Sequence, residues 1–150
     1  MIAEVDRYQG VVFRQLLLAH QGLVEIGVAD IVGRKDSFYF NDGAFQVKYS
    51  TKRLPPWQFT YMSDNLEELR ELRRRRDVVW SFLVCGVDGV VGLSFEELES
   101  ITSAGAGGVA WVRVRRGRNA MYRVAGAAGD LPRAKSRGVQ SFVAALAATS

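Results

Sequence analysis

The chain has 150 residues, of which 48% are hydrophobic and 24% are charged, and its formal net charge is +4. These values are typical of a globular domain that is large enough to bury a full core. The excess of cations is too small for a histone-like chain, and it permits an anionic partner without requiring one. The single cysteine, Cys85, excludes an internal disulfide and any metal site built from cysteines.

The distribution of apolar residues gives no sign of a membrane protein. No apolar run approaches the roughly 20 residues that a membrane-spanning helix needs. The first ten residues carry acidic side chains before any apolar run, unlike a secretory signal peptide. We therefore expect a cytoplasmic protein with no membrane partner. Cys85 lies in the apolar run VVWSFLVCG, which favours a buried structural thiol.

Apolar periodicity, turn signals and helix caps predict helices and strands along the whole chain. In chain order, the expected elements are a helix at about 3–20, strands at 24–32, 37–41 and 44–50, a helix at 66–76, strands at 78–86 and 90–93, a short helix to about 101, strands at 109–116 and 120–124, and a helix at 140–148. Turns or irregular segments are expected at 33–36, 51–62 and 103–108. The almost wholly apolar run at 78–86 indicates a strand covered on both faces.

These elements predict one α+β (mixed α/β) domain over residues 1–150. A central mixed β-sheet is flanked by helices, in the order α-β-β-β-α-β-β-α-β-β. The core is expected to span about 3–126, and the tail 127–150 is expected to be peripheral, with one short helix. Two helix starts have capping-box spacing, Asp64 with Glu67 and Ser94 with Glu97.

The hairpin that follows Asp36 admits two registers. If Asp42-Gly43 is a two-residue turn, the apolar side chains of both strands share one face. If Gly43 instead ends a three-residue turn, Asp36 lies opposite Lys48, but the apolar side chains are split between two faces. The hydrophobic pattern favours the two-residue turn.

The second strand of this hairpin carries Gln46-Val47-Lys48, and Asp36 or Asp30 precedes it. Over roughly residues 3–86, the predicted elements follow one another in a recognisable order. A helix comes first, then a strand meander, a strand with an acid or amide two residues before a lysine, a helix and a buried strand. This order resembles the core of the PD-(D/E)XK superfamily, the restriction-endonuclease-like nucleases. Gln46 and Lys48 stand at the (D/E)XK positions, and the upstream aspartate stands for the remaining acid.

The resemblance implies a metal-dependent nuclease. Asp36 and Gln46 would bind Mg²⁺, and Lys48 would support the attacking water or the charged phosphate, so these three residues are the expected catalytic site. Mg²⁺ takes oxygen ligands and activates water at neutral pH. An amide at position 46 offers an oxygen without charge, so an inactive relative is the alternative. In the purely structural alternative, Lys48 is a solvated strand lysine and Gln46 is a surface residue.

Cationic and aromatic residues occur together in two places, in the irregular segment expected at 51–62 and on the last hairpin expected at 109–124. The expected nucleic-acid-binding residues are Lys52, Arg53, Trp57, Arg113, Arg115, Arg116 and Arg118. Cations placed for phosphates, with aromatic rings able to stack on bases, indicate a surface for DNA or RNA. Strand alternation places Trp111, Arg113 and Arg115 on one face of the last hairpin.

Ordinary structural roles are the alternatives to these assignments. Trp57 and Phe59 can fill the core beneath a loop, and the last hairpin can be half exposed without a ligand. The arginine run at 73–76 is typical of a solvated helix end, where cations favour the helix dipole. Three hypotheses follow: a nuclease of PD-(D/E)XK type that requires Mg²⁺, a binder of DNA or RNA without catalysis, and a regulatory module. The module would pair the edge hairpin with a protein partner or form a homo-oligomer.

Overall fold

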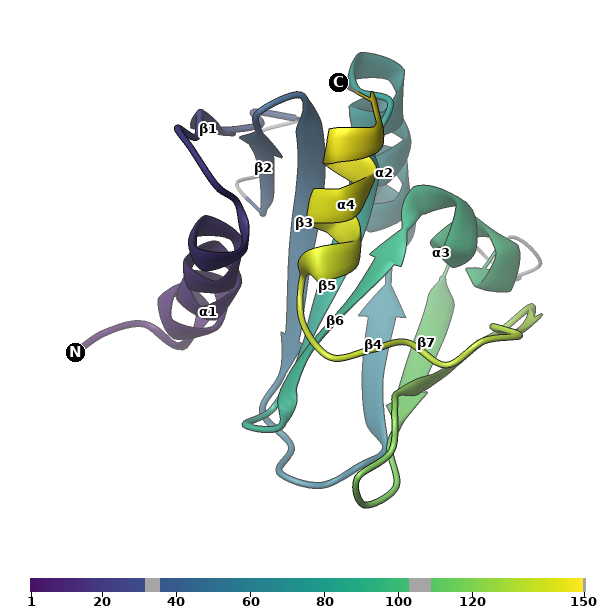
Figure 1. Cartoon of the computed structure of the whole chain (residues 1–150). Coiled ribbons are helices and arrows are strands. Elements are labelled where there is room, and N and C mark those ends of the chain that lie inside the picture. Colours follow the sequence, from purple (N-terminus) through teal and green to yellow (C-terminus); the bar gives the residue numbers. More distant parts are fainter. Residues whose placement is uncertain (32–35, 103–108, 150) are drawn as a thin grey trace.

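The computed structural model describes residues 1–31, 36–102 and 109–149 as an α+β domain with two β-sheets (Figure 1). The helices are α1 (Glu4–Ala19), α2 (Ser63–Arg75), α3 (Phe95–Thr102) and α4 (Gln140–Thr149). The strands are β1 (Ile26–Val28), β2 (Ser37–Phe40), β3 (Gly43–Ser50), β4 (Trp57–Tyr61), β5 (Val79–Cys85), β6 (Gly89–Ser94), β7 (Ala110–Arg115), β8 (Arg123–Gly126) and β9 (Gly129–Asp130). The predicted fold class is confirmed, and all four predicted helices are present.

The first sheet has five strands in the order β1-β2-β3-β5-β6. Strands β1, β2 and β3 form the expected antiparallel meander, and β5 then runs parallel to β3. Every residue of β5 is buried, because helices cover one face and the second sheet with α2 covers the other. The prediction of a strand covered on both faces is therefore confirmed.

Two apolar layers lie on either side of the first sheet. The layer between this sheet and helices α1 and α4 includes Val12, Leu16, Phe45, Phe82 and Phe142. The layer on the opposite face joins the sheet to α2, α3 and the second sheet, and it includes Trp57, Leu69, Leu83, Leu98 and Val112. Figure 1 shows this arrangement, with α4 in front of the first sheet and α2 behind it.

The β2–β3 hairpin turns at Asn41-Asp42, one residue earlier than predicted. Phe40 pairs with Gly43 and Phe38 pairs with Phe45, so the apolar side chains share one face as expected. Asn41 adopts a left-handed φ of 51°. A side chain on Gly43 would approach Leu146 Cδ2 to 2.6 Å, so this glycine permits the close packing of α4 and does not form the turn.

The segment at 51–62, predicted to be irregular, contains the strand β4. Its side chains alternate between buried and exposed, and it pairs with β7 so that Trp57 lies opposite Val114. The second sheet has the order β4-β7-β8-β9. The apolar side chains of β4 and β7 point into the layer shared with the first sheet. The predicted single sheet is therefore accompanied by a second one.

The C-terminal tail is not peripheral, which corrects the predicted core boundary. Phe142 is fully buried in the layer beneath α4, and Lys135 Nζ lies 2.8 Å from Glu97 Oε1 on α3. The helix predicted at 140–148 is confirmed as α4. The tail covers one face of the first sheet because Phe142 and Leu146 pack against it.

The helix caps predicted from the sequence are confirmed only in part. The capping box of Ser94 and Glu97 is confirmed, with the two reciprocal bonds at 3.0 and 3.1 Å. In α2, Asn65 instead accepts a bond from the Met62 backbone N–H at 2.9 Å. The loop predicted at 103–108 and residues 33–35 of the predicted break lie outside the described residues. Among the described helices, none is long and apolar enough to cross a membrane.

Candidate nucleic-acid interface

The outward surface of the second sheet carries three arginines and a tryptophan. Along β7 the valines are buried, while Trp111 and Arg113 are half-buried and Arg115 is exposed, as the predicted alternation requires. Arg123 of β8 is exposed and pairs with Arg115, so it projects from the same surface. We refer to Trp111, Arg113, Arg115 and Arg123 as the arginine face.

The cross-strand partners of this face leave its charges uncompensated. Arg115 lies directly opposite Arg123, and Arg113 lies opposite Ala125. Like charges in directly opposed positions destabilise a sheet. No carboxylate in the described part of the chain forms an ion pair with these three arginines. Asp130 of β9 pairs with Ala125, so it lies on the same face, one strand from Arg123 and two strands from Arg113.

The outward, polar side chains of β4 border the arginine face on the side away from β8. Gln58 of β4 pairs with Arg113, and its Oε1 accepts a bond from Arg113 Nη2 at 3.3 Å. The guanidinium carbon of Arg113 also lies 5.1 Å from the Trp111 ring centroid. Sequence reasoning missed Gln58 because β4 was not predicted. The alternation of apolar and polar residues in WQFTY was the signal that could have identified it.

Other predicted contacts lie at one end of the second sheet. Because Trp57 pairs with Val114, the loop before β4 and the turn after β7 lie together at that end, as Figure 1 shows. Lys52, Arg53 and Arg118 are exposed there, and Lys52 Nζ lies 3.0 Å from the Pro56 carbonyl oxygen. These three cations add positive charge at this end of the second sheet.

Arg116 does not belong to this surface, contrary to the prediction. Its guanidinium donates to both carboxylate oxygens of Asp88, with Nε 2.8 Å from Oδ2, and the Tyr122 hydroxyl donates to Asp88 Oδ2 at 2.6 Å. The side chains of Arg116 and Asp88 are each only 18% exposed. Hydrogen bonds from Arg116 and Tyr122 lower the pKa of Asp88 below its ordinary value. Arg116 therefore connects the β7–β8 turn to the β5–β6 turn.

Trp57 is also wrong as a nucleic-acid contact. Its side chain is 1% exposed, and its Nε1–H donates to the Lys52 carbonyl oxygen at 2.8 Å. The ring packs edge-on against Tyr122, with a centroid separation of 6.2 Å. A ring in this position cannot stack on a base, so the alternative role as a core side chain is confirmed.

Gln46 forms part of a buried polar cluster and not an open site. It is 1% exposed, and its Nε2 donates to Glu68 Oε1 of α2 at 2.6 Å. The Ser37 hydroxyl donates to the same oxygen at 2.7 Å, and Glu68 itself is 2% exposed. Ser37, Gln46 and Ser81 are cross-strand neighbours on β2, β3 and β5. This cluster fixes α2 on the sheet, because its hydrogen bonds are made in the interior.

Two of the three predicted catalytic residues, Asp36 and Lys48, lie at the same pocket. Both line a pocket of about 260 Å³ between α1, β3 and β4, which Gln58 also lines. Lys48 Nζ lies 4.9 Å from the Tyr61 ring centroid. Gln46 does not line this pocket, because it projects toward Glu68 on the face that α2 covers.

The structure does not bring the predicted metal ligands Asp36 and Gln46 together. The Asp36 carbonyl accepts a bond from the Val47 N–H, which places Asp36 beside Val47 and not beside Gln46. Asp30, the alternative acid, lines a different pocket beside α2. Within the described ranges, no group of three or more histidine, cysteine, aspartate or glutamate side chains could hold a metal ion.

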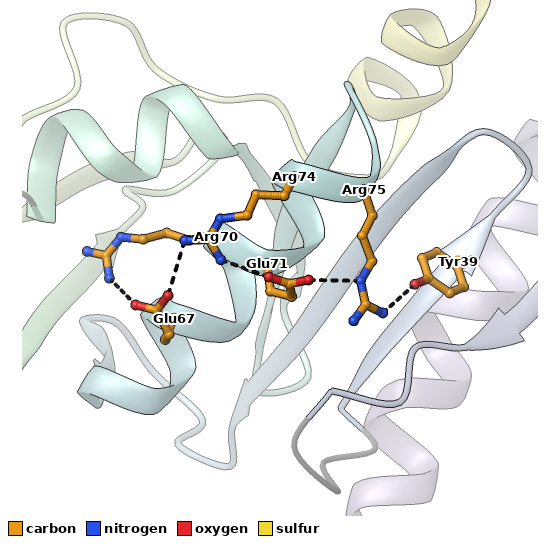
Figure 2. Close-up of polar contacts among 6 residues, drawn as sticks. All are labelled: Tyr39, Glu67, Arg70, Glu71, Arg74 and Arg75. Atoms are coloured by element: carbon orange, nitrogen blue, oxygen red, sulfur yellow. Dashed lines mark hydrogen bonds and ion pairs between the residues drawn. The ribbon is translucent and has the colours of Figure 1, made fainter.

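The arginines of α2 provide a contrast, because carboxylates accompany them (Figure 2). Glu71 accepts bonds from Arg74 at 2.8 Å and from Arg75 at 3.2 Å. Arg75 also donates to the Tyr39 hydroxyl of β2 at 2.9 Å. The two guanidiniums lower the pKa of Glu71. This part of α2 is therefore an ion-pair network on the protein surface.

Comparison of the chain with protein-family models, with curated proteins and with solved structures finds no match. The resemblance to PD-(D/E)XK nucleases therefore stays a prediction that rests on the element order and on Gln46-Val47-Lys48.

Proposed function

We propose that the protein binds DNA or RNA through the arginine face of its second sheet. The observation that carries this proposal is the pairing of Arg115 with Arg123, both exposed and without a carboxylate partner among the described residues. A phosphate bound between two such guanidiniums offsets their mutual repulsion, and arginine is well suited to phosphate recognition. Lys52, Arg53 and Arg118 at the end of the sheet add further cationic contacts.

The test is the salt dependence of oligonucleotide binding, followed by fluorescence anisotropy. The double variant Arg115→Ala/Arg123→Ala should bind at least about tenfold more weakly at low salt. The slope of log affinity against log salt should also fall by about 1.5, because about two phosphate contacts are lost. The matched control is Arg70→Ala/Arg74→Ala on α2, which removes the same charge from exposed ion pairs.

The control variant distinguishes binding at the arginine face from attraction by the net charge of the protein. We expect it to bind as the unmodified protein does. Equal losses in the two double variants would show that net charge alone attracts the oligonucleotide. No salt-sensitive binding by the unmodified protein would overturn the proposal.

Hydrolysis of the bound strand is the second candidate function. One observation favours it: the pocket lined by Asp36 and Lys48 adjoins the arginine face through Gln58. Labelled DNA and RNA are incubated with the protein in Mg²⁺, in Mn²⁺ and in EDTA. Metal-dependent cleavage that Lys48→Ala abolishes and Arg70→Ala leaves intact would establish a nuclease. Intact strands in every condition would remove hydrolysis and leave the binder.

The third hypothesis loses its structural premise. The last hairpin was expected to offer a free sheet edge, but β7 lies between β4 and β8. The outer side of β8 is covered by the following chain, where the Leu131 N–H donates to the Val124 carbonyl at 2.9 Å and Tyr122 pairs with Lys135. A protein partner or a homo-oligomer stays a prediction, without this hairpin as its edge.

A further inference from the structure

Trp111 is the aromatic residue of the arginine face, and small or short side chains surround it. Its partner on β4 is Thr60. On the β8 side, Ala125 pairs with Arg113 and is the diagonal neighbour of Trp111 on the same face. The indole is half-buried and stands above these neighbours, with the Arg113 guanidinium 5.1 Å from its centroid. The ring and the guanidinium thus form a cation–π pair, and a base can stack on the ring face that Arg113 does not cover.

The two arginines of β7 that face outward follow Trp111 at alternate positions of the strand. Trp111, Arg113 and Arg115 follow one another on one face of β7. Alternate residues of a strand are about 6.6 Å apart, so the backbone positions of these three residues span about 13 Å. A flexible chain that carries bases and phosphates in alternation can follow such a row. Sequence-tolerant binders of single strands combine stacking rings with backbone-contacting cations in this way.

A duplex fits this surface less well. Four strands about 4.8 Å apart are about 14 Å across before side chains are added, which is wider than the roughly 12 Å major groove. The faces of paired bases are also stacked on one another, so they are not open to Trp111. A duplex could still contact the arginines through its phosphates, but the indole would contribute little.

We infer that the arginine face selects single-stranded DNA or RNA, with Trp111 stacking on an unpaired base and Arg113, Arg115 and Arg123 holding the flanking phosphates. The inference rests on the proposed function, because it names the substrate class of the same surface. It goes further by assigning Trp111 a role that binding through charge alone does not require.

The test compares one labelled strand, its RNA equivalent and the corresponding DNA duplex at a single salt concentration. Trp111→Ala should weaken single-strand binding about tenfold, which corresponds to the loss of one stacked base, and should change duplex binding less than about twofold. Trp111→Phe should restore most of the single-strand affinity. Arg115→Ala/Arg123→Ala should weaken both. The urea midpoint of each variant shows whether it is folded.

Fluorescence gives a second readout. Trp57 and Trp80 are buried, so quenching of tryptophan emission by a single strand should disappear in Trp111→Ala. Equal effects of Trp111→Ala on single and double strands would overturn the inference and leave the proposed function standing. Tighter binding of the duplex than of the strand would overturn it as well. Failure of the unmodified protein to bind any of the three substrates would instead refute the proposed function.

Discussion

The C-terminal half of α2 and the outward surface of the second sheet are both rich in arginine, but only the first satisfies its charges within the protein. On α2, Glu71 lies one helical turn before Arg74 and Arg75, so each guanidinium has a carboxylate neighbour. On the second sheet, Arg115 faces Arg123. Runs of arginine that look alike in sequence therefore differ in what is left to bind a ligand.

Arg116 shows that two adjacent arginines in the sequence can differ in whether a carboxylate binds them. It follows Arg115 directly, yet it is half-buried and forms two bonds with Asp88. Its neighbour is exposed and has no such partner in the described structure. Arginine count is therefore a poor guide to a nucleic-acid surface, and the position of the carboxylates is a better one.

The largest effect is expected from Asp88→Ala. This change leaves Arg116 half-buried without its carboxylate and removes the acceptor of the Tyr122 hydroxyl. The free energy of unfolding should fall by about 2 kcal/mol, measured by urea denaturation. Oligonucleotide affinity under native conditions should not change. Glu99→Ala, at an exposed position of α3, is the control and should have little effect on stability.

The same contact gives a pH dependence of stability. Because the folded protein lowers the pKa of Asp88, its ionised form stabilises the fold above the ordinary carboxyl pKa of about 3.9. That contribution is lost as the pH falls through the lowered pKa. The stability difference between the unmodified protein and Asp88→Asn should be constant from pH 7 to about 5 and should shrink below about pH 4. A difference that grows in acid would contradict the assignment.

Arg115→Glu is expected to stabilise the protein while it weakens binding. A glutamate opposite Arg123 replaces a like-charge pair by an opposite-charge pair, which should raise the free energy of unfolding by about 0.5 kcal/mol. Oligonucleotide affinity should fall more than it does in Arg115→Ala. Loss of stability in Arg115→Glu would show that Arg115 has a structural partner, and the contrast with α2 would then fail.

The smallest effect is expected from Glu71→Ala. The ion pairs of Glu71 with Arg74 and Arg75 are exposed to solvent, where such pairs contribute little. Stability should decrease slightly at low salt and not measurably at high salt. Arg74 and Arg75 keep their contacts with Glu67 and Tyr39, so the loss of Glu71 should not raise oligonucleotide affinity as much as the arginine face contributes. A gain comparable to the loss in Arg115→Ala/Arg123→Ala would show that any unpaired arginines suffice.

The sequence predicts the parts of the fold that depend on local order. Helix α3 is identified by Ser94 and Glu97, which are three residues apart, and β5 by its almost wholly apolar run. Prediction from the sequence fails where contacts with a distant part of the chain decide the role of a residue. Gly43 looks like a turn glycine, but its position is set by the packing of Leu146.

The residues of the candidate site also divide into those whose positions local patterns predict and those whose positions they do not. Alternation along β7 correctly predicts which side chains face outward, because it needs only the strand period. Gln46 looks like a metal ligand beside Lys48, but a glutamate 22 residues away binds it in the interior. The partner of Arg116, 28 residues earlier in the chain, was equally out of reach of local patterns.

The most direct measurement is an NMR titration of the arginine side-chain Nε–Hε resonances with a short single-stranded oligonucleotide. The resonances of Arg113, Arg115 and Arg123 should shift in proportion to the bound fraction. Those of Arg74, Arg75 and Arg116, which are held by carboxylates, should stay unchanged. Shifts confined to the α2 arginines, or spread evenly over all arginines, would contradict binding at the second sheet.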